Sequence, residues 1–156
     1  MEKLHYRECE TGRRFIIKLE HGAKLPQILV DFAQAQNLNF ASLVSAVGSV
    51  CSVEISGIQA GAHLPMTEAR FKTSHLEGPL ELLSLEGNIA VGADKQLGGQ
   101  FWVLASKSNG EVAGGRLVGA EVFTTCEIVL AEYRVEGVER HHSTSTGVDT
   151  IYIEEW

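Results

Sequence analysis

The chain has 156 residues, 44% of them apolar and 21% charged, so it is long enough for one globular domain with a substantial core and too short for two full domains. Its formal net charge of -7 repels polyanions, which disfavours a general nucleic-acid coat unless the cations are clustered. Sixteen glycines, three prolines and 7% aromatic residues fit a turn-rich chain of mixed α and β structure and disfavour collagen-like, coiled-coil and disordered classes.

The first predicted element is a strand over residues 14–20. Its side chains alternate, with Phe15 and Leu19 on one side, which is the pattern of a strand with one buried face. A helix is predicted from Leu25 to near Asn37, because apolar residues recur there at helical spacing. Pro26 stands where a first helical turn tolerates a missing N–H group.

Short apolar runs rich in Val, Ile and Leu follow the helix and are separated by glycine. Such runs predict strands of five to nine residues each. The predicted strands are Phe40–Val47, Val50–Ile58, Leu80–Leu85, Asn88–Val91, Phe101–Ser106, Arg116–Val122 and Thr125–Tyr133.

Two connections between these runs have the composition of hairpin turns, Gly92–Gly99 and Ser108–Gly110. They predict an antiparallel or mixed sheet. One early helix beside a strand-rich remainder indicates an α/β chain of the α+β type. We expect a mixed, mostly antiparallel sheet that is strongly curved or barrel-like, because its strands carry many small residues.

The last thirty residues are acidic, with seven Asp and Glu against Arg134 and Arg140. His141–Gly147 is polar and predicts a loop, and Asp149–Ile153 predicts a short final strand. We expect this tail to fold back or to pair with another subunit.

Three widely spaced cysteines, Cys9, Cys51 and Cys126, form neither a disulfide framework nor a zinc motif, so free thiols in a reducing compartment are expected. The charged start of the chain lacks the apolar core of a secretory signal, which predicts a cytoplasmic protein. The uncharged stretch over residues 32–53 is interrupted by Gln, Asn and Ser and is too polar to span a membrane.

The residues alone name no catalytic site. None of the six histidines has the spacing that places two metal ligands on one face, and the adjacent His141 and His142 fit a surface loop. No serine lies in a nucleophile elbow, no cysteine has a histidine near it in sequence, and no glycine-rich phosphate motif occurs. We therefore predict no catalytic residue, no bound metal and no cofactor.

One basic cluster stands near the start of the chain. Arg13, Arg14, Lys18 and Lys24 face only Glu20 within the same dozen residues. It is the candidate surface for a nucleic acid or another anion.

Three segments resemble the plant and prokaryote conserved (PPC) domain. They are the opening residues 14–22, the central string GPLELLSLEGNI at 78–89, and GEVAGGRL at 110–117 with the apolar strand at 122–128. The likeness covers roughly residues 13–134. It places a PPC domain there, between an extension at 1–12 and an acidic tail at 135–156.

The resemblance implies a curved α/β domain that assembles as a homotrimer, with a fold shared distantly with acetolactate decarboxylase. It also implies a DNA-binding or transcription-associated role. In plant members a separate basic hook contacts DNA, and this chain has no Gly-Arg-Pro motif of that kind. The partners expected from the resemblance are therefore further copies of the chain and, in addition, DNA or a DNA-bound protein.

Many prokaryotic members carry three histidines suited to one divalent ion, and the matching positions here are Gln100, Trp102 and Arg116. A guanidinium and an indole cannot ligate a metal, so the family's ion is not expected. Arg116 then has two alternatives. It grips an anionic ligand in the former metal pocket beside Trp102, or it pairs with Glu81, Glu86 or Glu121.

Three functions follow from these observations. The first is a non-enzymatic trimeric regulatory module that binds DNA or a DNA-bound partner. The second is a small-anion-binding protein that uses the pocket at Gln100, Trp102 and Arg116. The third is a module that serves only protein assembly.

Overall fold

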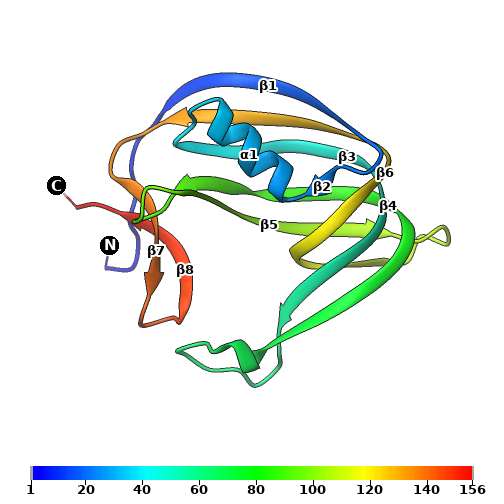
Figure 1. Cartoon of the computed structure of the whole chain (residues 1–156). Coiled ribbons are helices and arrows are strands. Elements are labelled where there is room, and N and C mark those ends of the chain that lie inside the picture. Colours follow the sequence, from blue (N-terminus) through cyan, green and yellow to red (C-terminus); the bar gives the residue numbers. More distant parts are fainter. Residues whose placement is uncertain (1, 156) are drawn as a thin grey trace.

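The computed structural model describes residues 2–155, which form a six-stranded sheet, a single α-helix and a separate two-stranded hairpin. Both ends of the chain lie on the same side of the molecule (Figure 1). The elements are β1 (Glu10–Glu20), β2 (Lys24–Leu25), α1 (Gln27–Ala35), β3 (Phe40–Ile58), the 3₁₀ turn η1 (Glu68–Arg70), β4 (Phe71–Val91), β5 (Leu97–Ser106), β6 (Val112–Arg134), β7 (Val138–Ser143) and β8 (Val148–Ile153).

The main sheet has the order β1-β6-β3-β4-β5, and β5 also pairs with the first part of β6. Strands β3, β4, β5 and β6 therefore form a closed circuit. Every ladder in the described part of the chain is antiparallel, and parallel pairing is limited to one bridge between Gly92 and Arg140. The predicted fold class is confirmed as α+β with a mostly antiparallel sheet and a single α-helix.

Long strands replace the pairs of short strands that the sequence predicts. Phe40–Val47 and Val50–Ile58 are both parts of β3, and the two predicted strands within 80–91 are both parts of β4. Strand β6 likewise contains both predicted strands within 116–133. The glycines interpreted as strand ends, Gly48 and Gly87, lie inside strands with positive φ, where a neighbouring backbone passes closely.

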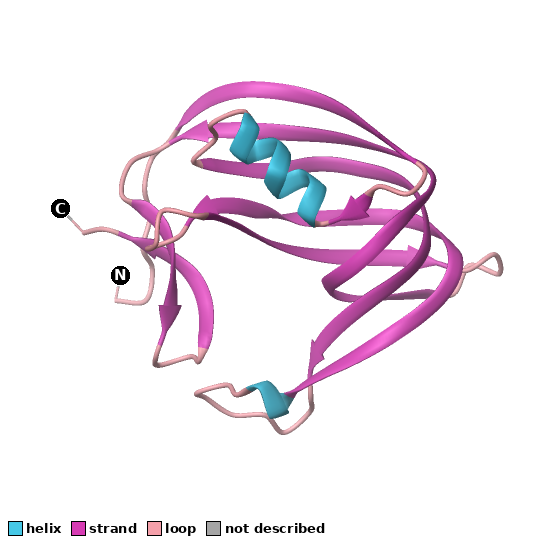
Figure 2. Cartoon of the chain, viewed as in Figure 1, coloured by secondary structure: helices cyan, strands magenta, loops and turns pink. Residues whose placement is uncertain are grey.

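Helix α1 covers one face of this sheet and buries Leu29 and Ala33 completely (Figure 2). Its Phe32 meets Phe15 of β1 edge-on, with the ring centroids 5.1 Å apart. The helix is shorter than predicted, because Leu25 belongs to β2 and Asn37 adopts a left-handed backbone conformation after the last turn. The predicted pattern of one buried face on β1 is present, with Leu19 in the core.

Both predicted turns connect antiparallel strands. Asn109 accepts a hydrogen bond from the backbone N–H of Glu111 at 3.0 Å in the turn before β6, and residues 92–96 join β4 to β5.

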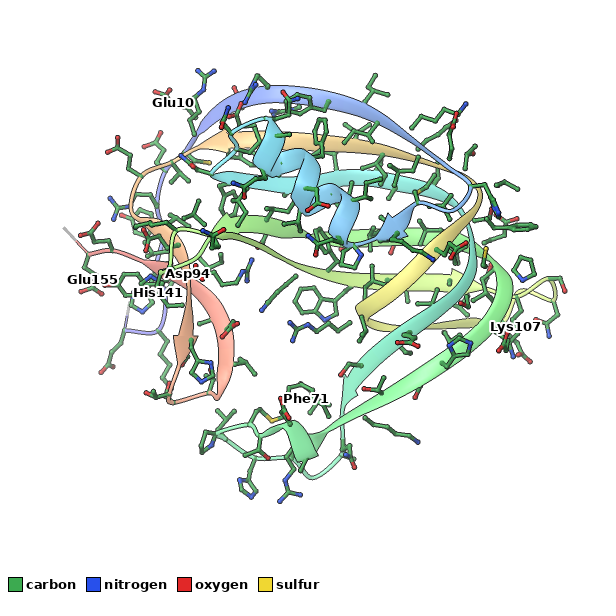
Figure 3. All side chains as sticks on the ribbon, viewed as in Figure 1. Glu10, Phe71, Asp94, Lys107, His141 and Glu155 are labelled. Carbon is green, nitrogen blue, oxygen red and sulfur yellow. The ribbon has the colours of Figure 1, made fainter. Side chains whose placement is uncertain are left out.

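The predicted loop at 141–147 is wrong at its start, because His141 and His142 belong to β7 and pair with β8. Figure 3 shows His141 on this hairpin and Phe71 at the far end of the long strands.

All three cysteines are free thiols, as predicted. No helix among residues 2–155 is long and apolar enough to cross a membrane.

Candidate functional site

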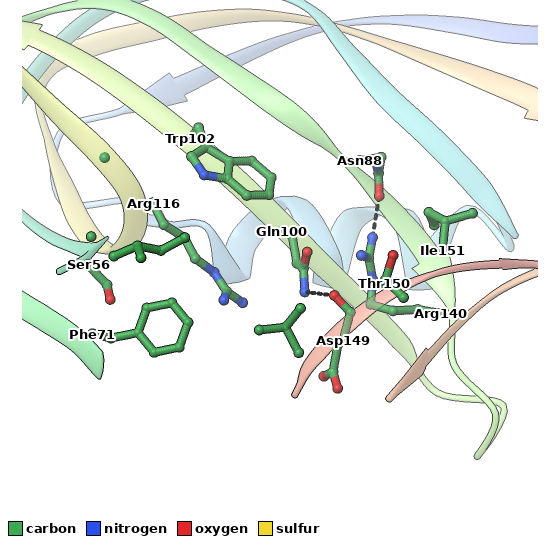
Figure 4. Close-up of a pocket in the computed structure, with 14 residues that line it drawn as sticks. Ser56, Phe71, Asn88, Gln100, Trp102, Arg116, Arg140, Asp149, Thr150 and Ile151 are labelled. Atoms are coloured by element: carbon green, nitrogen blue, oxygen red, sulfur yellow. Dashed lines mark hydrogen bonds between the residues drawn. The ribbon is translucent and has the colours of Figure 1, made fainter. Parts of the chain in front are cut away.

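The three positions singled out from the sequence line one cavity. Gln100, Trp102 and Arg116 border a hollow of about 550 Å³ on the sheet (Figure 4). The strand register explains why they meet, because Trp102 on β5 stands opposite Arg116 on β6 and Glu86 on β4. On its other side Arg116 is paired with Ser56 of β3, so one row of side chains runs across four strands.

This row points away from the helix. Val103 and Leu117, the neighbours of Trp102 and Arg116, are buried in the core, so alternation sends Trp102 and Arg116 to the opposite face. The cavity there is bounded at one end by Ile58 and Phe71.

The other boundary of the cavity comes from a part of the chain where the sequence predicted no site residue. The β7–β8 hairpin contributes Arg140 and residues 148–151. Gln100 holds the hairpin in place by donating from its side-chain amide to the backbone oxygen of Asp149 at 3.2 Å. Only the acidic composition of the tail marked this region in the sequence.

Arg116 has no acidic partner in residues 2–155. No ion pair joins it to Glu81, Glu86 or Glu121, and Glu121 is instead bound by Lys24, whose hydrogen bond and charge lower the pKa of that carboxyl. The positive charge of Arg116 therefore faces the cavity without a fixed counter-charge.

Arg140 is a second cation at this cavity. Its Nη2 atom donates to the side-chain oxygen of Asn88, whereas its Nε atom is buried and has no hydrogen-bond partner among the described residues. Burial lowers the pKa of the Arg140 guanidinium, Asp149 opposes this effect, and the charge of Arg116 adds to it. The two guanidinium groups thus repel each other across the same cavity.

The predicted basic cluster is divided by contacts with carboxylates. Arg13 donates to Glu132 from Nε at 3.0 Å and from its backbone N–H at 2.8 Å. Arg14 lies over the ring of Tyr133, 5.6 Å from its centroid. Lys24 is bound to Glu121, so Arg14 and Lys18 are the members of the cluster without an ion pair in the described part of the chain.

Comparison with protein families identifies the domain. The model of the Plants and Prokaryotes Conserved (PCC) domain matches residues 6–134. The chain belongs to this family. This match confirms the resemblance to the PPC domain, and it ends before β7, so the hairpin that completes the cavity lies outside the matched segment.

Solved structures share the fold of this PCC protein. A metal-containing protein from Archaeoglobus fulgidus is 30% identical to it, with a TM-score of 0.82 and coverage of 97% of this chain and 100% of that chain. A PPC protein from Pyrococcus horikoshii is 24% identical, with a TM-score of 0.78 and coverage of 98% and 99%. A "putative DNA-binding protein" from Ralstonia eutropha JMP134 is 16% identical, with a TM-score of 0.75 and coverage of 89% and 90%. No curated protein is significantly similar to the chain.

The side chains at the cavity do not fit a divalent ion. An indole is only a donor, a guanidinium keeps its proton, and the side-chain amide of Gln100 already donates to the hairpin. Residues 2–155 contain no group of three or more His, Cys, Asp or Glu placed to hold a metal. Arg116 and Arg140 are instead hydrogen-bond donors that carry positive charge.

Proposed function

We propose that this PCC-domain protein is a cytoplasmic, non-enzymatic regulatory module that works as a homotrimer. The observation that carries the proposal is the apolar character of the sheet face opposite α1. Ile16 on β1 is 90% exposed, and Val47 on β3 and Leu104 on β5 are also exposed. Exposed apolar patches of this kind mark interaction surfaces in water-soluble proteins.

Strand register places Ile16 and Val47 on one continuous surface, which we call the outer face. Ile16 stands opposite Val129 of β6, and Val129 stands opposite Ser45 of β3, two residues before Val47. Cross-strand partners share a face, so these side chains point to the same side as one another. A second copy of this chain fits such a face because the same apolar surface is present on both partners. The number of subunits, three, is proposed from the resemblance to the family.

The absence of enzymatic activity is proposed from the chemistry of the cavity. The described residues that line it include Ser56, Asp149 and Thr150, and no serine, threonine or cysteine hydrogen-bonds to a histidine or carboxylate there. Asp149 is bound to His142 at the hairpin instead. Arginines and aromatic walls suit binding better than acid–base work.

Light scattering coupled to size-exclusion chromatography tests the assembly. The unmodified chain is expected to elute with the mass of three copies. Ile16→Lys is expected to give smaller species, because a charged side chain cannot be buried against a partner without cost. Leu64→Lys is the matched control, since Leu64 is equally apolar, 63% exposed and lies in the loop between β3 and η1. A monomeric unmodified protein, or an Ile16→Lys variant that remains trimeric, would contradict the proposal.

Direct DNA binding is the second candidate function. The relative from Ralstonia eutropha is described as a "putative DNA-binding protein", and Lys18, two residues after Ile16 on β1, offers a cation without an ion pair on the outer face. Against it stand the net charge of -7 and the commitment of Arg13 and Lys24 to carboxylates. We therefore propose that association with DNA runs mainly through a DNA-bound protein.

Titration of a labelled duplex at low salt separates the two routes. If the basic cluster binds DNA directly, Lys18→Glu weakens binding and Lys72→Glu, which makes the same charge change on β4, weakens it less. Lys18 is chosen over Arg13 because Lys18 holds no buried partner, so the fold is expected to survive the change. If the unmodified chain does not bind at low salt, direct contact is excluded.

A further inference from the structure

The cavity at Trp102 and Arg116 is built for a ligand with an apolar body. Apolar surface predominates in its walls, with Trp102 and Phe71 as the large rings and Ile58, Val148 and Ile151 as the aliphatic side chains. Trp102 is 50% exposed, so a broad aromatic surface remains open to an incoming ring. Its volume of about 550 Å³ lies in the range of small-molecule sites.

Two cations and one acid determine the charge of this cavity. Arg116 and Arg140 are the positive groups, and Asp149 is the acid among the residues that line it. Asp149 accepts a hydrogen bond from Nδ1 of His142 at 3.0 Å, which keeps its carboxylate occupied at the hairpin. The lining residues thus carry a net formal charge of one positive unit. A ligand with a single negative charge neutralises it.

The unsatisfied donors point to the same conclusion. A buried N–H without an acceptor destabilises the fold, and the Nε atom of Arg140 is such a donor among the described residues. Arg116 forms no ion pair or hydrogen bond within residues 2–155. Figure 4 shows the guanidinium of Arg116 directed into the hollow, with Gln100 between it and Arg140. A planar oxyanion is the acceptor that matches guanidinium groups best.

We propose that this cavity binds a small aromatic monocarboxylate. Its carboxylate is held by Arg116 and Arg140, and its ring packs against Trp102 and Phe71. The residues that hold the ligand differ from Ile16 and Val47, which carry the assembly proposal. The site includes the β7–β8 hairpin, which lies beyond the segment that matches the family model.

Isothermal titration of the full chain with benzoate, 1-naphthoate and indole-3-carboxylate tests the proposal. At least one of these acids is expected to bind, whereas the matching neutral amides and acetate bind at least about tenfold more weakly, because they lack the charge or the ring. Inorganic phosphate is titrated in parallel. If no aromatic acid binds, if the amides bind equally well, or if phosphate binds in preference, the assigned ligand class is wrong.

Variants locate the site. Arg116→Gln and Arg140→Gln are each expected to raise the Kd of the acid that binds about tenfold or more, and Arg134→Gln, at the end of β6 and away from the cavity, is expected to leave it unchanged. Asn88→Asp keeps both arginines and is expected to weaken binding by neutralising Arg140, which covers the case in which Arg140→Gln fails to fold. Unchanged affinity in Arg116→Gln and Asn88→Asp would overturn the assignment. The affinities are compared between variants that have the same oligomeric state as the unmodified chain. The result of the binding test is therefore independent of whether the chain is a trimer.

Discussion

Glu132 is the one charged side chain that is buried in the described part of the chain. It accepts three hydrogen bonds from Arg13, two from the guanidinium and one from the backbone N–H, and hydrogen bonding by Arg13 is the main cause of the lowered pKa of its carboxyl. We expect Glu132→Gln to lower the free energy of unfolding by about 1–3 kcal/mol at neutral pH, because the charged hydrogen bonds to Arg13 are lost. Glu8→Gln, at an exposed position, is the control and is expected to change it by less than about 0.5 kcal/mol.

The same ion pair makes a prediction about pH. The carboxyl of Glu132 has a lower pKa in the folded chain than its ordinary value of 4.5, so its contribution to stability is full above that value and is lost as the pH falls through the folded-state pKa. The difference between the unmodified chain and Glu132→Gln is therefore expected to close in acid. Urea unfolding at neutral and acidic pH measures this difference in the free energy of unfolding. A difference that does not change with pH would show that the substitution alters packing and not a charged interaction.

Individual residues of the site differ in how far the sequence could predict them. Gln100, Trp102 and Arg116 were found through the family pattern, and adjacent strands place them around one cavity. Arg140 could not be found in this way. It reaches the cavity only because a hairpin more than twenty residues further along packs across the sheet, and no local periodicity encodes that contact.

The long strands depend on glycines that sequence patterns interpret as ends. Gly87 lies inside β4 with φ of 145°, and a Cβ atom there would collide with the carbonyl oxygen of Gln100 on β5. Strand composition was therefore predicted correctly, whereas strand length was not. Whether a glycine ends a strand or allows a close crossing depends on the partner strand, which the local sequence does not contain.

Substitution of Gly87 tests this role. Gly87→Ala is expected to destabilise the protein by at least about 2 kcal/mol, because both the backbone conformation and the space exclude a side chain. Gly98→Ala on β5 is the matched control. A Cβ atom at Gly98 meets no other atom within 4 Å, so stability is expected to stay the same or rise slightly. Thermal unfolding of both variants measures the contrast, and equal melting temperatures would show that the crossing tolerates a side chain.

The charge of the whole molecule and its apolar outer face act in opposite directions on assembly. In the proposed trimer, three copies would bring together three times the net charge of -7, which opposes association, while the exposed side chains of Ile16 and Val47 favour it. Raising the salt concentration from 0.1 M to 1 M shortens the Debye length from about 10 Å to about 3 Å and screens the repulsion, but it leaves apolar burial in place.

Assembly is therefore expected to tighten with salt, and DNA binding through Lys18 and its neighbours is expected to weaken over the same range, since phosphate contacts release counterions. Sedimentation velocity over a dilution series at the two salt concentrations measures the first effect, and duplex titration measures the second. If high salt instead dissociates the trimer, charged pairs and not the outer face hold the subunits together. Opposite responses in the two assays would separate the surface that joins copies of the chain from any surface that meets DNA.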